Sequence, residues 1–192
     1  MANWALTNYC IEGKPEDLQQ LFNLCEEFCT GKRPPMQKDA DNSWEGNIVL
    51  ALGEEIGESY IRGFINEYSL SDGVLRIDAA EAWGATNFRH ILTRHYPGMK
   101  VYYIVEEEGD EVFATNDAEG KYFPYRFFLR YEINGDGGTE EFKTRGEAMK
   151  YIAKLFGRKS INVSEVIEWN NAQVEADSDN CISLYEYKIT KN

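Results

Sequence analysis

The order of extended and helical patterns across the first half of the chain constrains its fold more than any other sequence feature. Three segments have the alternation or the short apolar run of strands: 4–11, 60–80 and 101–107. Two apolar stripes at helical spacing predict helices over 15–29 and 86–96. Ser71-Asp72-Gly73 predicts a hairpin turn inside 60–80. The resulting order, β-α-loop-β-β-α-β, is that of the ferredoxin-like split motif.

The strand expected at 101–107 indicates that the sheet continues beyond this unit. Its apolar side chains point to both faces, Val101 and Tyr103 to one and Tyr102 and Ile104 to the other, as in a covered interior strand. Further elements are expected as strands at 111–116, 123–133, 139–143 and 181–189, with a helix at 145–156. Thr144 and Glu147 form a capping box that opens this helix.

We therefore expect an α+β fold, with a ferredoxin-like βαββαβ unit whose extended, mostly antiparallel sheet has helices packed on it. Residues 1–110 would form the ferredoxin-like half. Residues 111–192 would form a β-hairpin plus helix half that continues the same sheet in one compact unit. Residues 30–46 predict a long exposed loop. The segment 47–56 fits a short strand or a helical turn, and 161–175 fits either a helix or a strand.

The charge of the chain restricts its partners. There are 33 acidic and 20 basic residues, which gives a formal net charge of −13. Binding to nucleic acid or to an anionic membrane needs clustered Lys and Arg, so both are disfavoured, whereas a basic protein partner is allowed. No apolar run approaches the roughly 20 residues of a membrane span. The first residues lack the pattern of a secretory signal, so we expect a cytoplasmic location.

The candidate catalytic residues are His90, His95 and Glu107. The two histidines are five residues apart, so on a helix they point away from each other and cannot bind one metal together. His95 continues the apolar stripe in the last turn, where it can pack and, when charged, interact with the helix C-terminus. His90 lies on the other side with Arg89 and Arg94, and a structural role is favoured for both histidines. Glu107 belongs to an acidic run that reads as a solvated hairpin tip, although a glycosidase-type role with a distant partner stays open.

Other motifs for cofactors or metals are incomplete. The segment "DADNSWEG" has Trp44 where a calcium loop needs Gly, and no phosphate-binding loop or nucleophile elbow occurs in the sequence. Cys25 and Cys29 lie on one face of the first helix, where we expect them to be small buried hydrophobic residues. We expect no cofactor and no metal.

Two motifs resemble a known family. The opening Asn3-Trp4 leads into a strand that ends at Gly13, and Ala82-Trp83 is followed by "HYPGMKVYYIVEEEG" and an aromatic strand. This resembles the phage- and mobile-element-associated Api-type bacterial proteins, described as carrying a ferredoxin-like domain. The resemblance implies a ferredoxin-like sheet and a bacterial cytoplasmic protein. It implies no activity and no catalytic residues.

Our leading hypothesis is a small, acidic, soluble, non-enzymatic binding protein with a protein partner, because no complete catalytic constellation occurs. Exposed sheet edges would also permit a homo-oligomer. The second hypothesis is a carboxylate- or metal-assisted hydrolase that uses groups near Trp83, His90 or His95. The third is an acidic DNA mimic, which would need carboxylates spaced like phosphates along one face.

Overall fold

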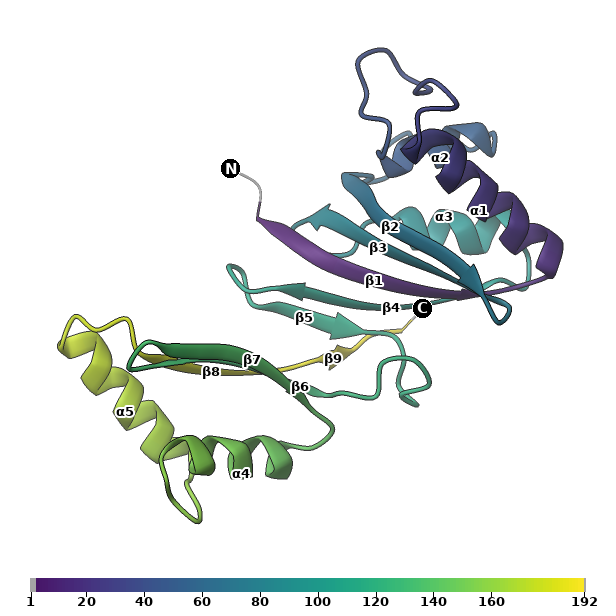
Figure 1. Cartoon of the computed structure of the whole chain (residues 1–192). Coiled ribbons are helices and arrows are strands. Elements are labelled where there is room, and N and C mark those ends of the chain that lie inside the picture. Colours follow the sequence, from purple (N-terminus) through teal and green to yellow (C-terminus); the bar gives the residue numbers. More distant parts are fainter. Residues whose placement is uncertain (1–2, 192) are drawn as a thin grey trace. The chain divides into compact units, whose positions relative to one another are not determined.

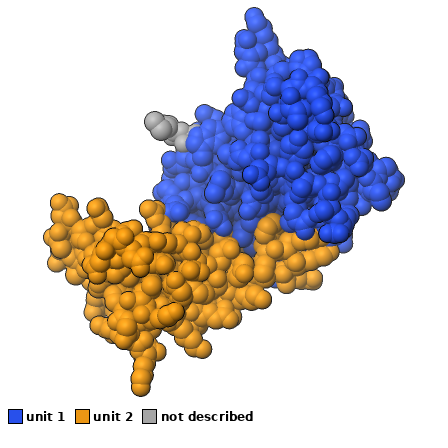
Figure 2. Space-filling view, viewed as in Figure 1, with its two compact units in different colours: residues 1–118, 189–192 blue, residues 119–188 orange. Residues whose placement is uncertain are grey.

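The computed structural model describes residues 3–191 and has an α+β architecture (Figure 1). The chain divides into two compact units, which Figure 2 colours separately. Unit 1 consists of residues 1–118 and 189–192, and unit 2 consists of residues 119–188. No helix within 3–191 is both long enough and apolar enough to cross a membrane.

Unit 1 is built on a six-stranded sheet with the strand order β2-β3-β1-β4-β5-β9. Its strands are β1 (Trp4–Glu12), β2 (Gly63–Ser71), β3 (Val74–Ala82), β4 (Lys100–Glu107), β5 (Val112–Thr115) and β9 (Lys188–Ile189). β1 is central and antiparallel to both of its neighbours, β3 and β4. β4 also pairs with β5, so it is an interior strand, as its two apolar faces predicted.

Three helices lie on one face of this sheet (Figure 1): α1 (Pro15–Cys29), α2 (Glu45–Ala51) and α3 (Phe88–His95). Tyr9 and Ile11 on the inner face of β1 are buried with Phe28 of α1 and Leu92 of α3 in one apolar core. Cys25 is also fully buried in this core, as expected for a small apolar residue. The opposite face of the sheet has no helix of unit 1 on it (Figure 1).

The hairpin between β2 and β3 confirms the turn predicted at Ser71-Asp72-Gly73. Asp72 and Gly73 both have positive φ, 53° and 72°, which is the geometry of a tight two-residue hairpin turn. Of residues 47–56, left open by the sequence, 47–51 belong to α2, 52–53 form a turn and 54–56 are irregular. Most of the loop expected at 30–46 is irregular, although its last two residues already belong to α2.

Unit 2 has its own three-stranded sheet, in the order β7-β6-β8. The strands are β6 (Phe127–Ile133), β7 (Asp136–Phe142) and β8 (Cys181–Glu186), and the helices are α4 (Arg145–Leu155) and α5 (Val163–Glu175). Its core is formed by Leu129, Ile152, Val166 and Ile182. The ambiguous segment 161–175 is therefore helical, and Asn162 opens it with a capping box.

Two details of the second half differ from expectation. We expected 111–192 to continue the first sheet, but of these residues only β5 and β9 join it. β6 pairs on one side with β7 and on the other with β8, so neither of its edges is available to β5. The strand expected from Phe123 begins only at Phe127. Pro124 lies in the missing part and has no backbone N–H to donate to a neighbouring strand.

Candidate functional site

The three candidate residues from the sequence lie apart and have separate surroundings. His90 is exposed on α3, where partial burial and then the nearby Arg89 charge lower its pKa. His95 is half-buried at the end of α3, with its Nδ1 3.0 Å from Glu54 Oε1. Arg94 also contacts Glu54, at 2.8 Å, so this is a surface cluster of charges.

Glu107 is buried and shapes a turn. Its two carboxylate oxygens accept hydrogen bonds from the backbone N–H groups of Gly109, at 2.7 Å, and Asp110, at 2.6 Å. Both donors belong to the turn that follows β4, so the carboxylate is already occupied in holding that turn. In the described part of the chain no three or more His, Cys, Asp or Glu side chains are placed to hold a metal ion.

The sequence did not reveal a pair of buried acidic side chains, Glu45 and Glu81, which we call the buried carboxyl pair. Both have an exposed fraction of 0%. Glu45 is the first residue of α2, and Glu81 lies near the end of β3. The inner face of β3 presents Leu75, Ile77 and Ala79 to the core, and Glu81 follows them in the same phase. Acidic side chains are almost never fully buried unless they are paired.

Hydrogen-bond donors converge on Glu81. The Tyr9 hydroxyl donates to its two carboxylate oxygens at 2.8 and 2.9 Å. The backbone N–H of Thr86 donates to Oε1 at 2.9 Å, and the Thr86 hydroxyl lies 2.6 Å from the same oxygen. Donors of this number compensate the negative charge of a buried carboxylate.

Glu45 has the opposite surroundings. The Thr86 hydroxyl lies 2.9 Å from Glu45 Oε2, and Glu45 Oε1 has no hydrogen-bond partner in the described structure. Burial first, and then the Glu81 charge, raises the pKa of Glu45 well above its usual range. Thr86 has one hydroxyl proton for two carboxyl groups. With Glu45 protonated, Glu45 donates to Thr86 Oγ and the Thr86 hydroxyl donates to Glu81, so the two carboxyls are linked through Thr86.

The buried carboxyl pair is enclosed too tightly to contact a substrate. A Cβ atom at Gly63 on β2 would lie 2.4 Å from Glu45 Oε2, so only glycine allows the strand to approach this closely. The Arg89 guanidinium donates to the backbone oxygens of Ala85 and Thr86 and lies over the Tyr103 ring, at 4.7 Å from its centroid. It is thus held by groups other than the two carboxyls.

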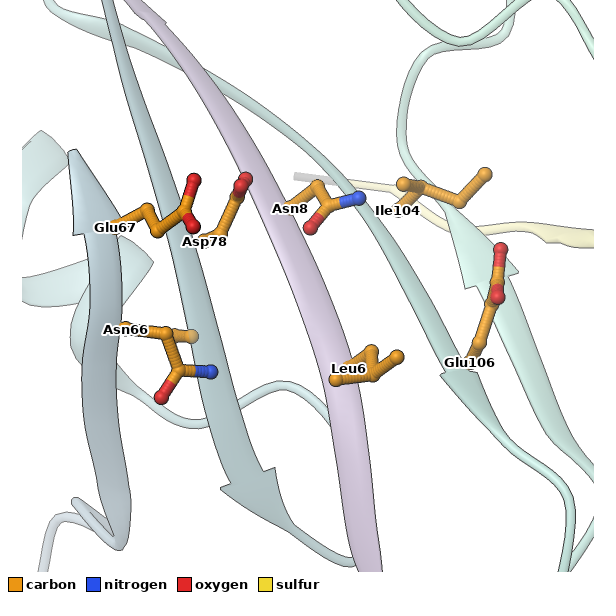
Figure 3. Close-up of a pocket in the computed structure, with 8 residues that line it drawn as sticks. Leu6, Asn8, Asn66, Glu67, Asp78, Ile104 and Glu106 are labelled. Carbon is orange, nitrogen blue, oxygen red and sulfur yellow. The ribbon is translucent and has the colours of Figure 1, made fainter. Parts of the chain in front are cut away.

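A second site lies on the face of the sheet opposite α1, α2 and α3; we call it the open-face pocket. It has a volume of about 310 Å³. Figure 3 shows its lining side chains, which come from four neighbouring strands: Leu6, Asn8, Asn66, Glu67, Asp78, Ile104 and Glu106. The strand register explains this grouping, because Glu67, Asp78, Asn8 and Ile104 form one row across β2, β3, β1 and β4.

The row places two negative charges side by side. Glu67 and Asp78 are directly opposite each other in the β2–β3 ladder, and Figure 3 shows their carboxylates close together. Burial first, and then the Glu67 charge, raises the pKa of Asp78. Among residues 3–191, no basic side chain forms an ion pair with either carboxylate, and Arg76 donates instead to Ser71 Oγ at 3.3 Å. Like charges directly opposite in a sheet are destabilising.

One exposed apolar side chain, Leu6, lines this pocket, and further exposed apolar side chains lie on or just after the same strands. Leu6 is 61% exposed and Trp4 46%, both on the open face of β1. The Trp4 ring packs against Phe64 of β2, with centroids 5.6 Å apart. Trp83, also 46% exposed, follows β3 and is held by a hydrogen bond from its backbone N–H to the Asn3 carbonyl at 2.8 Å. The open-face pocket is therefore an acidic patch beside exposed apolar surface.

Comparison with known proteins gives no relative for this chain: no protein-family model, no curated protein and no solved structure matches it.

Proposed function

We propose that this protein is a non-enzymatic binding protein whose open-face pocket takes a basic segment of a protein partner. The observation that carries the proposal is the opposition of Glu67 and Asp78 across β2 and β3, to neither of which any basic side chain of residues 3–191 is paired. This arrangement costs stability in the protein alone. A Lys or Arg of a partner placed between the two carboxylates would turn the repulsion into attraction.

The surroundings of the two carboxylates define the partner further. Leu6 and Ile104 border the pocket, and Leu6 is mostly exposed, so the bound segment would carry apolar side chains next to its basic ones. Asn8 and Asn66 supply amide groups that can both donate and accept hydrogen bonds. The net charge of −13 adds a long-range attraction for basic partners and a dependence on salt.

The buried carboxyl pair is the nearest approach to an acid–base pair, but its closure gives it no access to a substrate. For this reason we do not propose the hydrolase hypothesis.

A binding experiment with a defined peptide tests the proposal. The probe is a synthetic peptide of alternating Lys and Leu, measured by calorimetry with the wild type at low and at moderate salt. We expect binding that weakens as salt rises, and a loss of at least about tenfold in affinity for the Glu67→Gln/Asp78→Asn variant, as for one lost charge-assisted contact. A peptide of alternating Glu and Leu should not bind.

A matched control separates the pocket from the overall charge. Glu168 and Glu175 are exposed on α5 of unit 2, so the Glu168→Gln/Glu175→Gln variant changes the net charge by the same amount elsewhere. We expect it to bind the Lys-Leu peptide within about twofold of the wild type. If both double variants lose affinity equally, the pocket has no specific role and the proposal fails.

We also propose that residues 1–110 form a ferredoxin-like unit. The order of elements, the strand order β2-β3-β1-β4 and the helices on one face support this assignment. The short helix α2 before β2 and the strands beyond β4 are additions to that motif. Kinship with the Api-type bacterial proteins remains a proposal as well. It is supported by the pairing of the two motifs, because Trp4 is opposite Ala82 and Trp83 bonds to Asn3.

A further inference from the structure

The buried carboxyl pair joins the sheet to α2, which also buries Ile48 and Val49 in the apolar core. Glu45 begins α2, and the long loop 30–44 precedes it directly. The same turn of α2 carries Asn47, whose side-chain amide donates to the backbone oxygens of Asp41, at 2.8 Å, and Asn42, at 3.2 Å. The loop is therefore held by the first turn of α2, and that turn is anchored in the core by Glu45.

Further contacts fix the end of the loop to β2 and to the segment before it. The Trp44 indole N–H donates to the Ile61 carbonyl at 3.0 Å, and the Ile65 N–H donates to the Ser43 carbonyl at 2.9 Å. These bonds are satisfied only while the first turn of α2 stays against β2. Glu45 lies directly after Trp44, so a movement of Glu45 away from the sheet would strain these bonds.

A second negative charge at this position would be strongly unfavourable. The groups that face the pair from the surrounding elements are Tyr9 of β1, Cys25 of α1, Thr86 and Arg89 at and after the end of β3, and Tyr60 before β2. Tyr9 already donates to Glu81, burial raises the pKa of the Cys25 thiol, and Arg89 is held by backbone oxygens and the Tyr103 ring. None of these groups supplies a positive charge in contact with Glu45, and a buried charge without compensation is very costly.

We propose that the proton on Glu45, which is linked to Glu81 through Thr86, is a pH-sensitive latch whose loss releases the first turn of α2 and the loop 30–44 from the sheet. When the proton passes to solvent, the two adjacent carboxylates repel each other. Glu45 can then reach water only by moving away from Gly63, and α2 moves with it. This inference concerns the buried carboxyl pair and does not depend on the proposed function.

The latch would control a concave surface of the protein. Loop residues face Trp44 and Phe64 across a depression of about 520 Å³, lined by Gln37, Lys38, Asp39, Ala40, Asp41, Trp44 and Phe64. Release of the loop would remove one wall of this depression. The shape of this surface would therefore differ between acidic and alkaline conditions.

The sign of the pH dependence follows from the raised pKa of Glu45. In the unfolded chain Glu45 ionises near its ordinary pKa of about 4.3. In the folded protein it holds its proton to higher pH, because burial and Glu81 raise its pKa. Its contribution to stability is thus complete below the unfolded value, falls as pH rises above that value, and is lost once pH exceeds the folded value.

Hydrogen exchange of the full chain tests the latch. Exchange of the backbone amides in 30–51 is measured from pH 5 to pH 9 for the wild type and for Glu45→Gln, which has the same shape but cannot ionise. At each pH the exchange rate of the wild type is divided by that of Glu45→Gln, which cancels the intrinsic acceleration of exchange by hydroxide. We expect a ratio near one at pH 5 that rises with pH by up to about tenfold per unit, as for one proton.

Two further measurements make the test decisive. The helix α5 in the same samples serves as a reference, and its ratio should stay near one at every pH. Tyr9→Phe removes a donor from Glu81, so the pair should hold its proton more tightly and the rise in exchange should shift to higher pH. A ratio for 30–51 that is constant from pH 5 to pH 9 would overturn the proposal. If Glu45→Gln does not fold, an unshifted profile in Tyr9→Phe would overturn it.

Discussion

The buried side chain of Asn47 accepts a hydrogen bond from the backbone N–H of Met36 at 2.9 Å. The two residues are eleven positions apart along the chain. The same amide donates to backbone oxygens further along the loop. A single side chain in the first turn of α2 is therefore the hydrogen-bond partner of backbone groups that would otherwise bond to water. Asn47 thus substitutes for secondary structure in the loop 30–44.

Replacement of Asn47 by alanine should destabilise the protein by about 2 kcal/mol, because it leaves several partly buried backbone groups without partners. Urea unfolding measures this loss. Asn171→Ala is the control, since Asn171 is exposed on α5 and its removal should change stability by less than about 0.5 kcal/mol. Equal stability of the two variants would mean that the Asn47 amide does not hold the loop.

Gly63 should tolerate no side chain. A Cβ atom there would meet Glu45 Oε2 at 2.4 Å and Cδ at 2.5 Å, so Gly63→Ala should force β2 and α2 apart and cost about 2 kcal/mol. Gly146 in α4 is the matched control, because the nearest atom to its added Cβ is 4.0 Å away. Gly146→Ala should stabilise the protein by about 0.5–1 kcal/mol. Thermal unfolding of both variants measures the two opposite shifts, and a gain in stability from Gly63→Ala would refute the close approach.

Local chemistry made much of the fold predictable. Asp72-Gly73 can adopt two consecutive positive φ angles, which few other pairs do, and the hairpin forms there. The apolar stripe of α1 and Pro15 in its first turn placed that helix correctly. The division into two sheets could not be predicted, because which strand pairs with β6 depends on contacts distant in sequence.

The candidate sites depend even more on distant contacts. Glu81 could have been noticed, since it follows Ile77 and Ala79 in phase on the inner face of β3. Glu45 lies in a polar segment with no such signal, and only the fold brings it to Glu81. To predict that Glu67 lies opposite Asp78, the register of the β2–β3 hairpin must be known. The irregularity between Ile65 and Glu67 shifts that register, and the alternation of apolar and polar residues does not reveal the shift.

Glu54 should give a pH dependence opposite in sign to that of Glu45. Hydrogen bonds from Arg94, and then from His95, hold its pKa below the usual range. Its stabilising contribution is therefore complete above the ordinary pKa of about 4.3 and is lost as pH falls through the lower folded value. We expect the difference in urea midpoint between wild type and Glu54→Gln to shrink as pH falls from 6 towards 3. A difference that grows over this range would contradict the assignment.

The cysteines should differ in reactivity in the folded protein. Cys25 is fully buried, which raises the pKa of its thiol, and burial raises the pKa of Cys10 to about 11. Cys181 is only partly buried. Because the thiolate is the reactive form, iodoacetamide should modify Cys181 before Cys10 and Cys25, as followed by peptide mass spectrometry. All four cysteines should react at similar rates in urea. Modification of Cys25 as fast as Cys181 in the native protein would show that the core around α1 opens readily.

The capping box of α4 should be a measurable local contribution to stability. The Thr144 hydroxyl oxygen accepts from the Glu147 N–H at 3.2 Å, and the Glu147 carboxylate accepts from the Thr144 N–H at 3.1 Å. Both donors belong to the helix start and have no helical partner. Thr144→Ala should therefore cost about 1 kcal/mol, whereas Thr144→Ser, which keeps the oxygen, should cost little. Urea unfolding and hydrogen exchange in 145–155 measure the effect. If the alanine and serine variants have equal stability and equal hydrogen exchange, water bonds to the backbone N–H groups of the first turn of α4 as well as the capping box does.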